Sequence, residues 1–258
     1  MKKIIALFIV YIGLISGVMA KDIRFVQVTD LKYSNINDNG TLAEFVKEIN
    51  NQEGINFVVF AGNNIDAPSA KNLEGFINEA KKLKKPFYVL IGDKDVNKHK
   101  NLSKQQYASY LRKRLWNYRK TDLNYTFERE GIVFMVVDGS RDIIPSSVGY
   151  YKEDVLDWVK TRLDKQSKKN VIILQHYPLT SPDGKEVTFR PEKYLEILSS
   201  HNNVKAVISG SKYQNSEQDI NGINHISTAP FPTYRVVDIV DCDTEKPTIW
   251  AEIREFKK

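Results

Sequence analysis

The sequence contains one cysteine, Cys242, and only four histidines in 258 residues. A lone cysteine cannot form an internal disulfide, so stability must come from the hydrophobic core. It also excludes a zinc site built from several thiolates. No Gly-x-Ser-x-Gly turn, P-loop or Gly-x-Gly-x-x-Gly motif is present, so serine hydrolases and the common nucleotide-binding classes are not indicated.

Long apolar runs are equally scarce, and the longest one lies at the start of the chain. Lys2 and Lys3 precede an apolar run over residues 4–15, and small residues follow up to Ala20. This layout predicts a secretory signal peptide over residues 1–20. We therefore expect an exported protein, periplasmic, extracellular or on the cell surface. If the signal were not cleaved, it would serve as a membrane anchor. No other segment approaches the ~18 apolar residues of a spanning helix.

Charge of one sign is not concentrated anywhere along the chain. The formal net charge is +6, but the lysines are scattered and often neighbour Glu or Asp. A nucleic-acid surface would need clustered basic residues interleaved with aromatic ones, so no nucleic-acid partner is expected. Without repeats, low-complexity stretches or a Pro- or Ser-rich linker, residues 21–258 are predicted to form a single domain.

Strand and helix signals alternate through the first half of the chain. Apolar runs predict strands over residues 23–28, 57–61, 87–91, 125–128, 132–137, 171–174 and 204–208. Helices are predicted to start at a capping box over residues 41–44, after the caps Ser69 and Ser103, near Lys152 and near Tyr194. The tail reads as strands over residues 223–227, 235–240 and 248–253. Strand–helix units followed by a run of strands indicate an α/β fold with mixed sheets.

Five of these strands lead into residues of the kinds found in ligand-binding and catalytic sites. Asp30, Gly62, Gly92, His176 and Gly210 each follow an apolar strand directly or after one residue. Ligands in α/β proteins gather at the carboxyl ends of strands. These five strand ends therefore predict one convergent pocket.

The motifs at the strand ends resemble those of the calcineurin-like metallophosphoesterases, the superfamily that includes purple acid phosphatases and cyclic nucleotide phosphodiesterases. In chain order they read Asp30-Leu31-Lys32, Gly62-Asn63-Asn64-Ile65-Asp66, Gly92-Asp93-Lys94-Asp95, His176-Tyr177-Pro178 and Gly210-Ser211-Lys212-Tyr213. The resemblance covers essentially the whole chain after the signal segment. It implies a four-layer α/β/β/α sandwich, with two mixed sheets face to face and helices outside.

The resemblance also implies a dinuclear metal centre with seven protein ligands, and this chain departs from that set. Asp30 and His176 match, and Asp93 stands in an Asn slot. Asn63 replaces the bridging Asp, Lys32 a ligand His, and Ser211 and Tyr213 the last two ligands, while Lys94 stands in the slot of the acid His. Because an ammonium has no lone pair for a metal, we expect the two-metal centre to be lost and no cofactor to be bound. The alternative is one divalent ion, Mn, Zn or Fe, on a vestigial set of Asp30, Asn63, Asp93 and His176.

Two interpretations of Lys32 and Lys94 follow from their charge. They can neutralise the buried carboxylates Asp30, Asp93 and Asp95, or they can form an anion pocket together with Ser211 and Tyr213. The predicted function is thus an exported, non-catalytic binding protein, a pseudophosphatase, with a phosphate-like anion or a protein as partner. The alternatives are an active phosphoesterase with a reduced metal site and an extracytoplasmic interaction scaffold.

Overall fold

The computed structural model describes residues 22–100, 102–118, 122–210 and 214–258. The signal-peptide prediction over residues 1–20, and Ser211 and Tyr213, lie outside these ranges. Within them, no helix is both long enough and apolar enough to cross a bilayer.

Two mixed β-sheets form the centre of the molecule. The first has the strand order β11-β10-β1-β2-β3, and the second has the order β4-β5-β6-β7-β9-β8. Strands β1, β2 and β3 are parallel, as are β5, β6, β7 and β9, while β10, β11, β4 and β8 run antiparallel to their neighbours. The strands are β1 Ile23–Val28, β2 Phe57–Ala61, β3 Phe87–Leu90, β4 Tyr125–Arg129, β5 Ile132–Val137, β6 Val171–Gln175, β7 Val204–Gly210, β8 Ser216–Ile220, β9 Ile223–Thr228, β10 Thr233–Val240 and β11 Thr248–Glu255.

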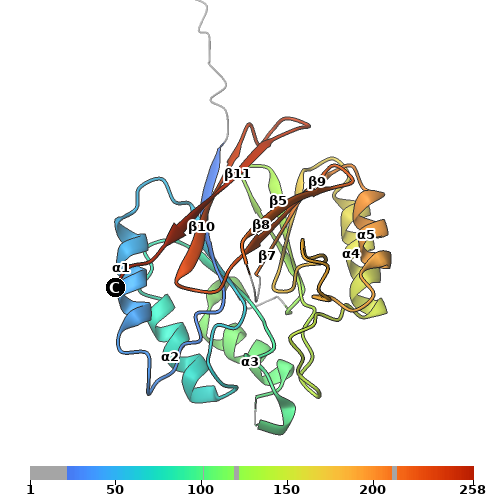
Figure 1. Cartoon of the computed structure of the whole chain (residues 1–258). Helices are drawn as coiled ribbons and strands as arrows, with labels where there is room; N and C mark the ends of the chain where they lie inside the picture. Colours follow the sequence, from blue (N-terminus) through green and yellow to red (C-terminus); the bar gives the residue numbers. More distant parts are fainter. Residues whose placement is uncertain (1–21, 101, 119–121, 211–213) are drawn as a thin grey trace, which may run out of the picture.

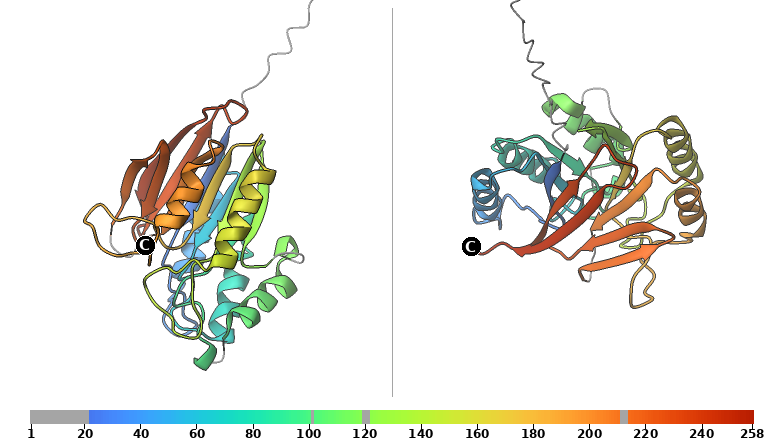
Figure 2. Two further views of the ribbon diagram at one scale, coloured as in Figure 1. Left: turned by 90° about the vertical axis from the view of Figure 1, so that its right-hand side faces the viewer. Right: turned by 90° about the horizontal axis from the view of Figure 1, so that it is seen from above.

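Helices cover the outer faces of both sheets, which completes the predicted four layers. Helices α1 and α2 lie outside the first sheet and α4 and α5 outside the second (Figure 1). The side view in Figure 2 shows α4 and α5 lying across the second sheet. The helices are α1 Thr41–Asn51, α2 Ala70–Ala80, α3 Lys104–Arg114, α4 Glu153–Lys165 and α5 Glu192–Ser199, with short 3-10 turns η1 Lys98–Lys100 and η2 Trp116–Tyr118.

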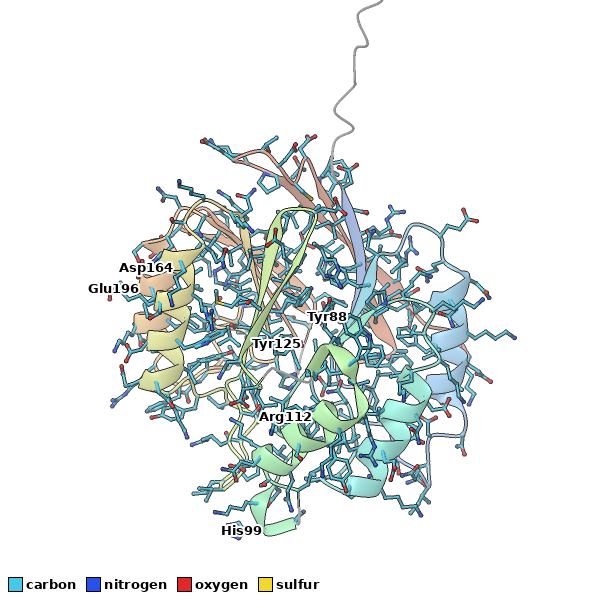
Figure 3. All side chains as sticks on the ribbon, turned by 180° about the vertical axis from the view of Figure 1, so that it is seen from behind. Tyr88, His99, Arg112, Tyr125, Asp164 and Glu196 are labelled. Carbon is cyan, nitrogen blue, oxygen red and sulfur yellow. The ribbon has the colours of Figure 1, made fainter. Side chains whose placement is uncertain are left out.

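An aromatic core holds the two sheets together. Phe25 of β1 stacks on Phe57 of β2 with ring centroids 4.7 Å apart, and Phe134 of β5 meets Phe57 edge-on at 5.1 Å. Where the sheet edges β3 and β4 meet, Tyr88 stacks on Phe127; Figure 3 shows Tyr88 and Tyr125 in this central region. Buried aromatic pairs of this kind contribute more than their buried area alone. This packing fixes the relative position of the two sets of strand ends.

The predicted helix starts were partly correct. Ser69 caps α2 by accepting from Asn72 N, and Ser103 forms a reciprocal capping box with Gln106. The capping box predicted over residues 41–44 is wrong, because Thr41 already lies inside α1 and the cap residue is Gly40 with φ 77°. Asp38 accepts from Leu42 N instead. Since Asp, Gly and Thr can all end a loop before a helix, the local pattern did not specify which residue takes the cap.

Candidate functional site

The predicted pocket forms where the strands of both sheets end. Asp30 N donates to Gly62 O at 2.9 Å and Lys32 N to Asn63 O at 3.0 Å, which joins the loops after β1 and β2. Gly62, at φ 97°, lies so close to His176 after β6 that an added Cβ would sit 2.6 Å from its Nδ1. A side chain at position 62 would therefore displace His176 from the site.

A cavity of about 200 Å³ opens among these loops. Its lining brings together every predicted site residue that the structure describes. The lining residues are Asp30, Lys32, Asn63, Asp93, Lys94, Ser147, His176, Tyr177, Pro178 and Val187. Ser147 and Val187 were not predicted, because they come from irregular loops whose sequences carry no recognisable motif.

Asn63 occupies the centre of the site. Its Nδ2 donates to Asp30 Oδ1 and to Asp93 Oδ1, each at 3.1 Å. Its Oδ1 accepts from the backbone N of Lys94 at 2.8 Å. The opposite amide orientation would face two donors toward each other and set an oxygen against two carboxylates, so the hydrogen-bond network fixes the orientation. The amide thus holds together the two carboxylates that the family resemblance assigns to metal ions.

Asp30 is buried, and each of its carboxylate oxygens accepts a hydrogen bond. Thr29 Oγ1 donates to Asp30 Oδ2 at 3.0 Å, and Lys32 Nζ lies 3.6 Å from Asp30 Oδ1. Asp30, Lys32 and Asn63 all have left-handed backbones, with φ between 52° and 57°. Such conformations are uncommon for non-glycine residues and cluster at functional sites. Here they occur at three side chains, from the loops after β1 and β2, that line the same cavity.

His176 is the second group that faces the carboxylates. Its Nδ1 donates to Ala61 O at 2.7 Å, which leaves Nε2 directed at Asp93 Oδ1, 3.9 Å away. Burial lowers the pKa of His176, but Asp93, Asp30 and the Ala61 carbonyl outweigh it, so the pKa is raised overall. Burial raises the pKa of Asp93, but His176 and Asn63 more than compensate, so that pKa is lowered. Both shifts favour the charged form of the group, the imidazolium of His176 and the carboxylate of Asp93.

This pair predicts a pH dependence of stability. A histidine whose folded-state pKa is raised stabilises the fold fully below its unfolded pKa of about 6.5, and loses that contribution as pH rises through the folded value. The stability gap between the wild type and His176→Gln should therefore shrink between pH 5.5 and pH 9. Urea unfolding at several pH values measures it, and a gap that stays constant or widens would show that His176 is not charged in the folded state.

The two lysines have different environments. Lys32 is exposed but its ammonium approaches Asp30, which agrees with the charge-neutralising interpretation. Lys94 is exposed and lines the cavity. Among the residues that the structure describes, the ion pairs with a nitrogen–oxygen distance of up to 4.0 Å do not include it. The proposed pairing with Asp95 is not seen. The Lys94 side chain therefore stands at the cavity mouth outside these ion pairs.

Asp95 has a structural function instead. It is fully buried and accepts from Gly92 N at 2.8 Å, Asn64 N at 2.8 Å and Ile65 N at 3.1 Å, with Asn64 Nδ2 at 3.3 Å. Burial raises the pKa of this carboxyl to about 7 despite these donors. Asp95 thus ties the loop after β3 to the loop after β2, and keeps Asn63 and Asp93 adjacent.

As arranged, the donor set does not fit the metal centre that the family resemblance implies. Two N–H bonds of Asn63 point at the oxygens that would hold a cation, so binding would require this amide to turn and lose three hydrogen bonds. Across the described ranges, no group of three or more His, Cys, Asp or Glu side chains is placed to hold a metal ion. Ser211 and Tyr213, in the last ligand block, lie outside those ranges.

Known proteins with similar sequences and folds agree with this architecture. The sequence model of the calcineurin-like phosphoesterase family matches residues 23–210. A protein of Arcobacter nitrofigilis, named probable glycerophosphodiester phosphodiesterase GpdQ, is 26% identical over 225 residues, 82% of this chain and 79% of that protein. A dimetal phosphatase from Danio rerio superposes with a TM-score of 0.65 at 17% identity, covering 89% of this chain and 98% of that one. A purple acid phosphatase from yellow lupin (Lupinus luteus) superposes with a TM-score of 0.61 at 13% identity, covering 92% and 52%.

The match to the family model extends from β1 to the end of β7, the last of the strands predicted to end at the pocket. The two solved structures share the two-sheet sandwich. The resemblance noted in the motifs is thereby confirmed. This protein belongs to the calcineurin-like phosphoesterase family.

Proposed function

We propose that this protein is an exported, non-catalytic member of its family, which binds a small phosphate-like anion in the lysine-lined cavity. The observation that carries this proposal is the position of Asn63, whose amide donates to both Asp30 and Asp93. Two-metal hydrolysis needs two cations that clamp the phosphate and activate a bridging hydroxide. A neutral amide can hold the carboxylates together, but it supplies neither function.

The charges around the cavity support anion binding. Two lysines, Lys32 and Lys94, line it together with His176, whose pKa is raised, and only two carboxylates. Both carboxylates already accept hydrogen bonds from Asn63, and Asp30 also accepts one from Thr29. These hydrogen bonds offset part of the negative charge of the two carboxylates. The Lys94 side chain stays exposed at the mouth of the cavity. The volume of about 200 Å³ suits a ligand smaller than a typical drug-sized molecule.

The metal content of residues 21–258 tests the first half of this proposal. After equilibration with manganese, zinc and iron and removal of free metal, we expect less than ~0.1 equivalents of each by mass spectrometry, because Asn63 and the lysines disfavour cations. One or more tightly bound equivalents would overturn the proposal. Assays with phosphodiesters and phosphomonoesters would then be the next step.

Substituting the lysines tests the second half. Lys94→Met should weaken the binding of inorganic phosphate by roughly tenfold, since a charged hydrogen bond contributes about 1.5–3 kcal/mol. Lys32→Met should weaken it less, because Lys32 is partly engaged with Asp30. Isothermal titration calorimetry measures both, with Lys81→Met, at the exposed residue that follows α2, as the matched control. Equal affinity of Lys94→Met and Lys81→Met would place phosphate binding elsewhere.

A second candidate is an active phosphoesterase with one metal ion. It is favoured by the convergence of Asp30, Asp93 and His176, all ligand-type side chains, on one cavity. It predicts that manganese raises turnover of a phosphodiester and that His176→Ala abolishes it. Turnover that does not respond to manganese and to His176→Ala would exclude this candidate.

A further inference from the structure

A second cavity, of about 270 Å³, lies beside the loop that follows β5. It shares no lining residue with the first cavity, although residues 138–150 contribute to both. Its lining combines basic and apolar side chains. The lining residues are Lys104, Ser140, Arg141, Asp142, Ile143, Ile144 and Lys152.

Arg141 lines this cavity and also carries a buried polar atom without a partner. Its Nε is buried and has no hydrogen-bond acceptor among the described residues. Its guanidinium carbon lies 5.7 Å from the ring centre of Tyr150, which orients the planar group. Burying a charged donor without an acceptor is unfavourable. Because protein encloses Nε, an oxyanion in the cavity would pair with the outer N–H groups of the guanidinium, in the forked geometry that arginine favours, and offset its positive charge.

The other charges of the cavity do not supply that acceptor. Lys104 Nζ is already held by Asp138 at 2.7 Å and by the Ser140 carbonyl at 2.6 Å. The Asp142 carboxylate accepts from Lys104 N at 2.9 Å. Lys152 is exposed and adds a second positive charge. The side of the cavity formed by Arg141 can therefore accept one anionic group of a ligand.

The opposite wall is apolar. Ile143 and Ile144 are 58% and 70% exposed, which is unusual for two consecutive large aliphatic side chains. Both line the same cavity as Arg141. A ligand that covered them would gain free energy with every methylene removed from water. The recognised molecule therefore needs an apolar chain as well as a charged head.

From this juxtaposition we propose that the second cavity binds an amphipathic anion, a carboxylate or phosphate head on a medium-length alkyl chain. The head is held by the Arg141 guanidinium with Lys152 nearby, and the chain lies along Ile143 and Ile144. The inference does not depend on the proposed function, because none of these residues lines the first cavity.

Titrating the whole protein with octanoate and octyl phosphate tests this inference. Calorimetry should show one saturable site for at least one of them, and the methyl NMR signals of Ile143 and Ile144 should shift. Octanol lacks the charge and acetate lacks the chain, so both should bind at least tenfold more weakly. Shortening the chain should cost about three- to fourfold per methylene.

Variants separate this site from nonspecific association. Arg141→Met should weaken octanoate binding at least tenfold, and Arg141→Lys should weaken it less, because the charge remains but the guanidinium fork is lost. Ile144→Ser should weaken it severalfold. The matched control is Arg162→Met, since Arg162 also lies 5.7 Å from an aromatic ring, that of Trp158, on the exposed surface of α4.

Three results would overturn the proposal. The first is octanol binding as tightly as octanoate, which would indicate a purely apolar contact. The second is equal affinity of Arg141→Met and Arg162→Met. The third is ligand-induced NMR shifts at His176 without shifts at Ile143 and Ile144, which would place the anion in the first cavity. Ile144→Ser changes only an exposed side chain, so it keeps the test valid if Arg141→Met does not fold.

Discussion

Asn63→Asp should destabilise the metal-free protein by about 3–5 kcal/mol at pH 7.5, the range for an uncompensated buried charge. The Asn63 amide donates to two carboxylates at 3.1 Å each, so an aspartate here sets a third carboxylate against Asp30 and Asp93. Like charges at this distance cannot all ionise without cost. Urea unfolding measures the loss, and lowering the pH should recover part of it by protonating one of the three carboxyls.

The same substitution should make stability depend on divalent metal. Three carboxylates and His176 around one point form a donor set that manganese or zinc accepts. We expect metal to restore much of the lost stability in Asn63→Asp and to leave the wild type unchanged, because a ligand that binds only the folded state stabilises it. If the wild type responds to metal as strongly as the variant, Asn63 is not the residue that disfavours the metal.

Two controls separate charge from packing. Asn63→Ala removes the amide without adding a charge, so it should lower stability but show no response to metal. Asn202→Asp adds a carboxylate at an exposed position and should change stability by less than about 0.5 kcal/mol. A metal response in Asn63→Ala would show that the existing residues suffice to bind an ion.

Asp95→Ala should lower the free energy of unfolding by about 3–5 kcal/mol. It leaves three backbone N–H groups and the Asn64 amide without their acceptor. Each buried unsatisfied group costs about 1–3 kcal/mol, and water entering the space relieves part of this cost. Asp95→Asn should cost less, since its single oxygen keeps some of these bonds. Asp66→Ala is the control, because Asp66 ends the preceding motif, Gly62-Asn63-Asn64-Ile65-Asp66, but is exposed. A cost below about 1 kcal/mol would show that Asp95 does not hold the loops.

The cost of Asp95→Ala should also depend on pH. The pKa of Asp95 in the folded protein is raised to about 7. A raised carboxyl pKa stabilises the fold at acidic pH, and this contribution is lost as pH rises from about 3.9, the unfolded value, to the folded value. The cost should therefore be greater at pH 5 than at pH 8. The opposite trend would indicate that the hydrogen bonds keep the carboxylate ionised.

Most of the secondary structure could be predicted because its signals are local. The buried strands β2 and β6 are continuous apolar runs, and α2 shows a 3.6-residue apolar stripe. Strand β8 was not predicted. Its sequence, Ser-Glu-Gln-Asp-Ile, is polar with no fully buried position, and it forms at a sheet edge by pairing with β9. Such a strand depends on its neighbour and not on its own residues.

The candidate site also has features that the sequence could predict and features that it could not. The order of the motifs at the strand ends indicated that their residues would converge, and the residue types there led to the expectation that the metal ligands of the family are replaced. The partner of each lysine could not be predicted, because a four-carbon side chain reaches several carboxylates from one backbone position. Asp95, whose carboxylate accepts hydrogen bonds from the backbone of two loops, was likewise predicted only as a possible partner for a lysine.

By itself, the sequence determined the fold family and the order of the elements, since these depend on residue type and spacing. Only the tertiary structure decided which groups contact the carboxylates of Asp30 and Asp93. It placed the Asn63 amide and the His176 imidazole against the two carboxylates, left Lys94 at the cavity mouth and brought Arg141, Ile143 and Ile144 together around a second cavity. Hydrogen bonds and burial depend on distances between residues far apart in the chain, which a one-dimensional pattern does not contain.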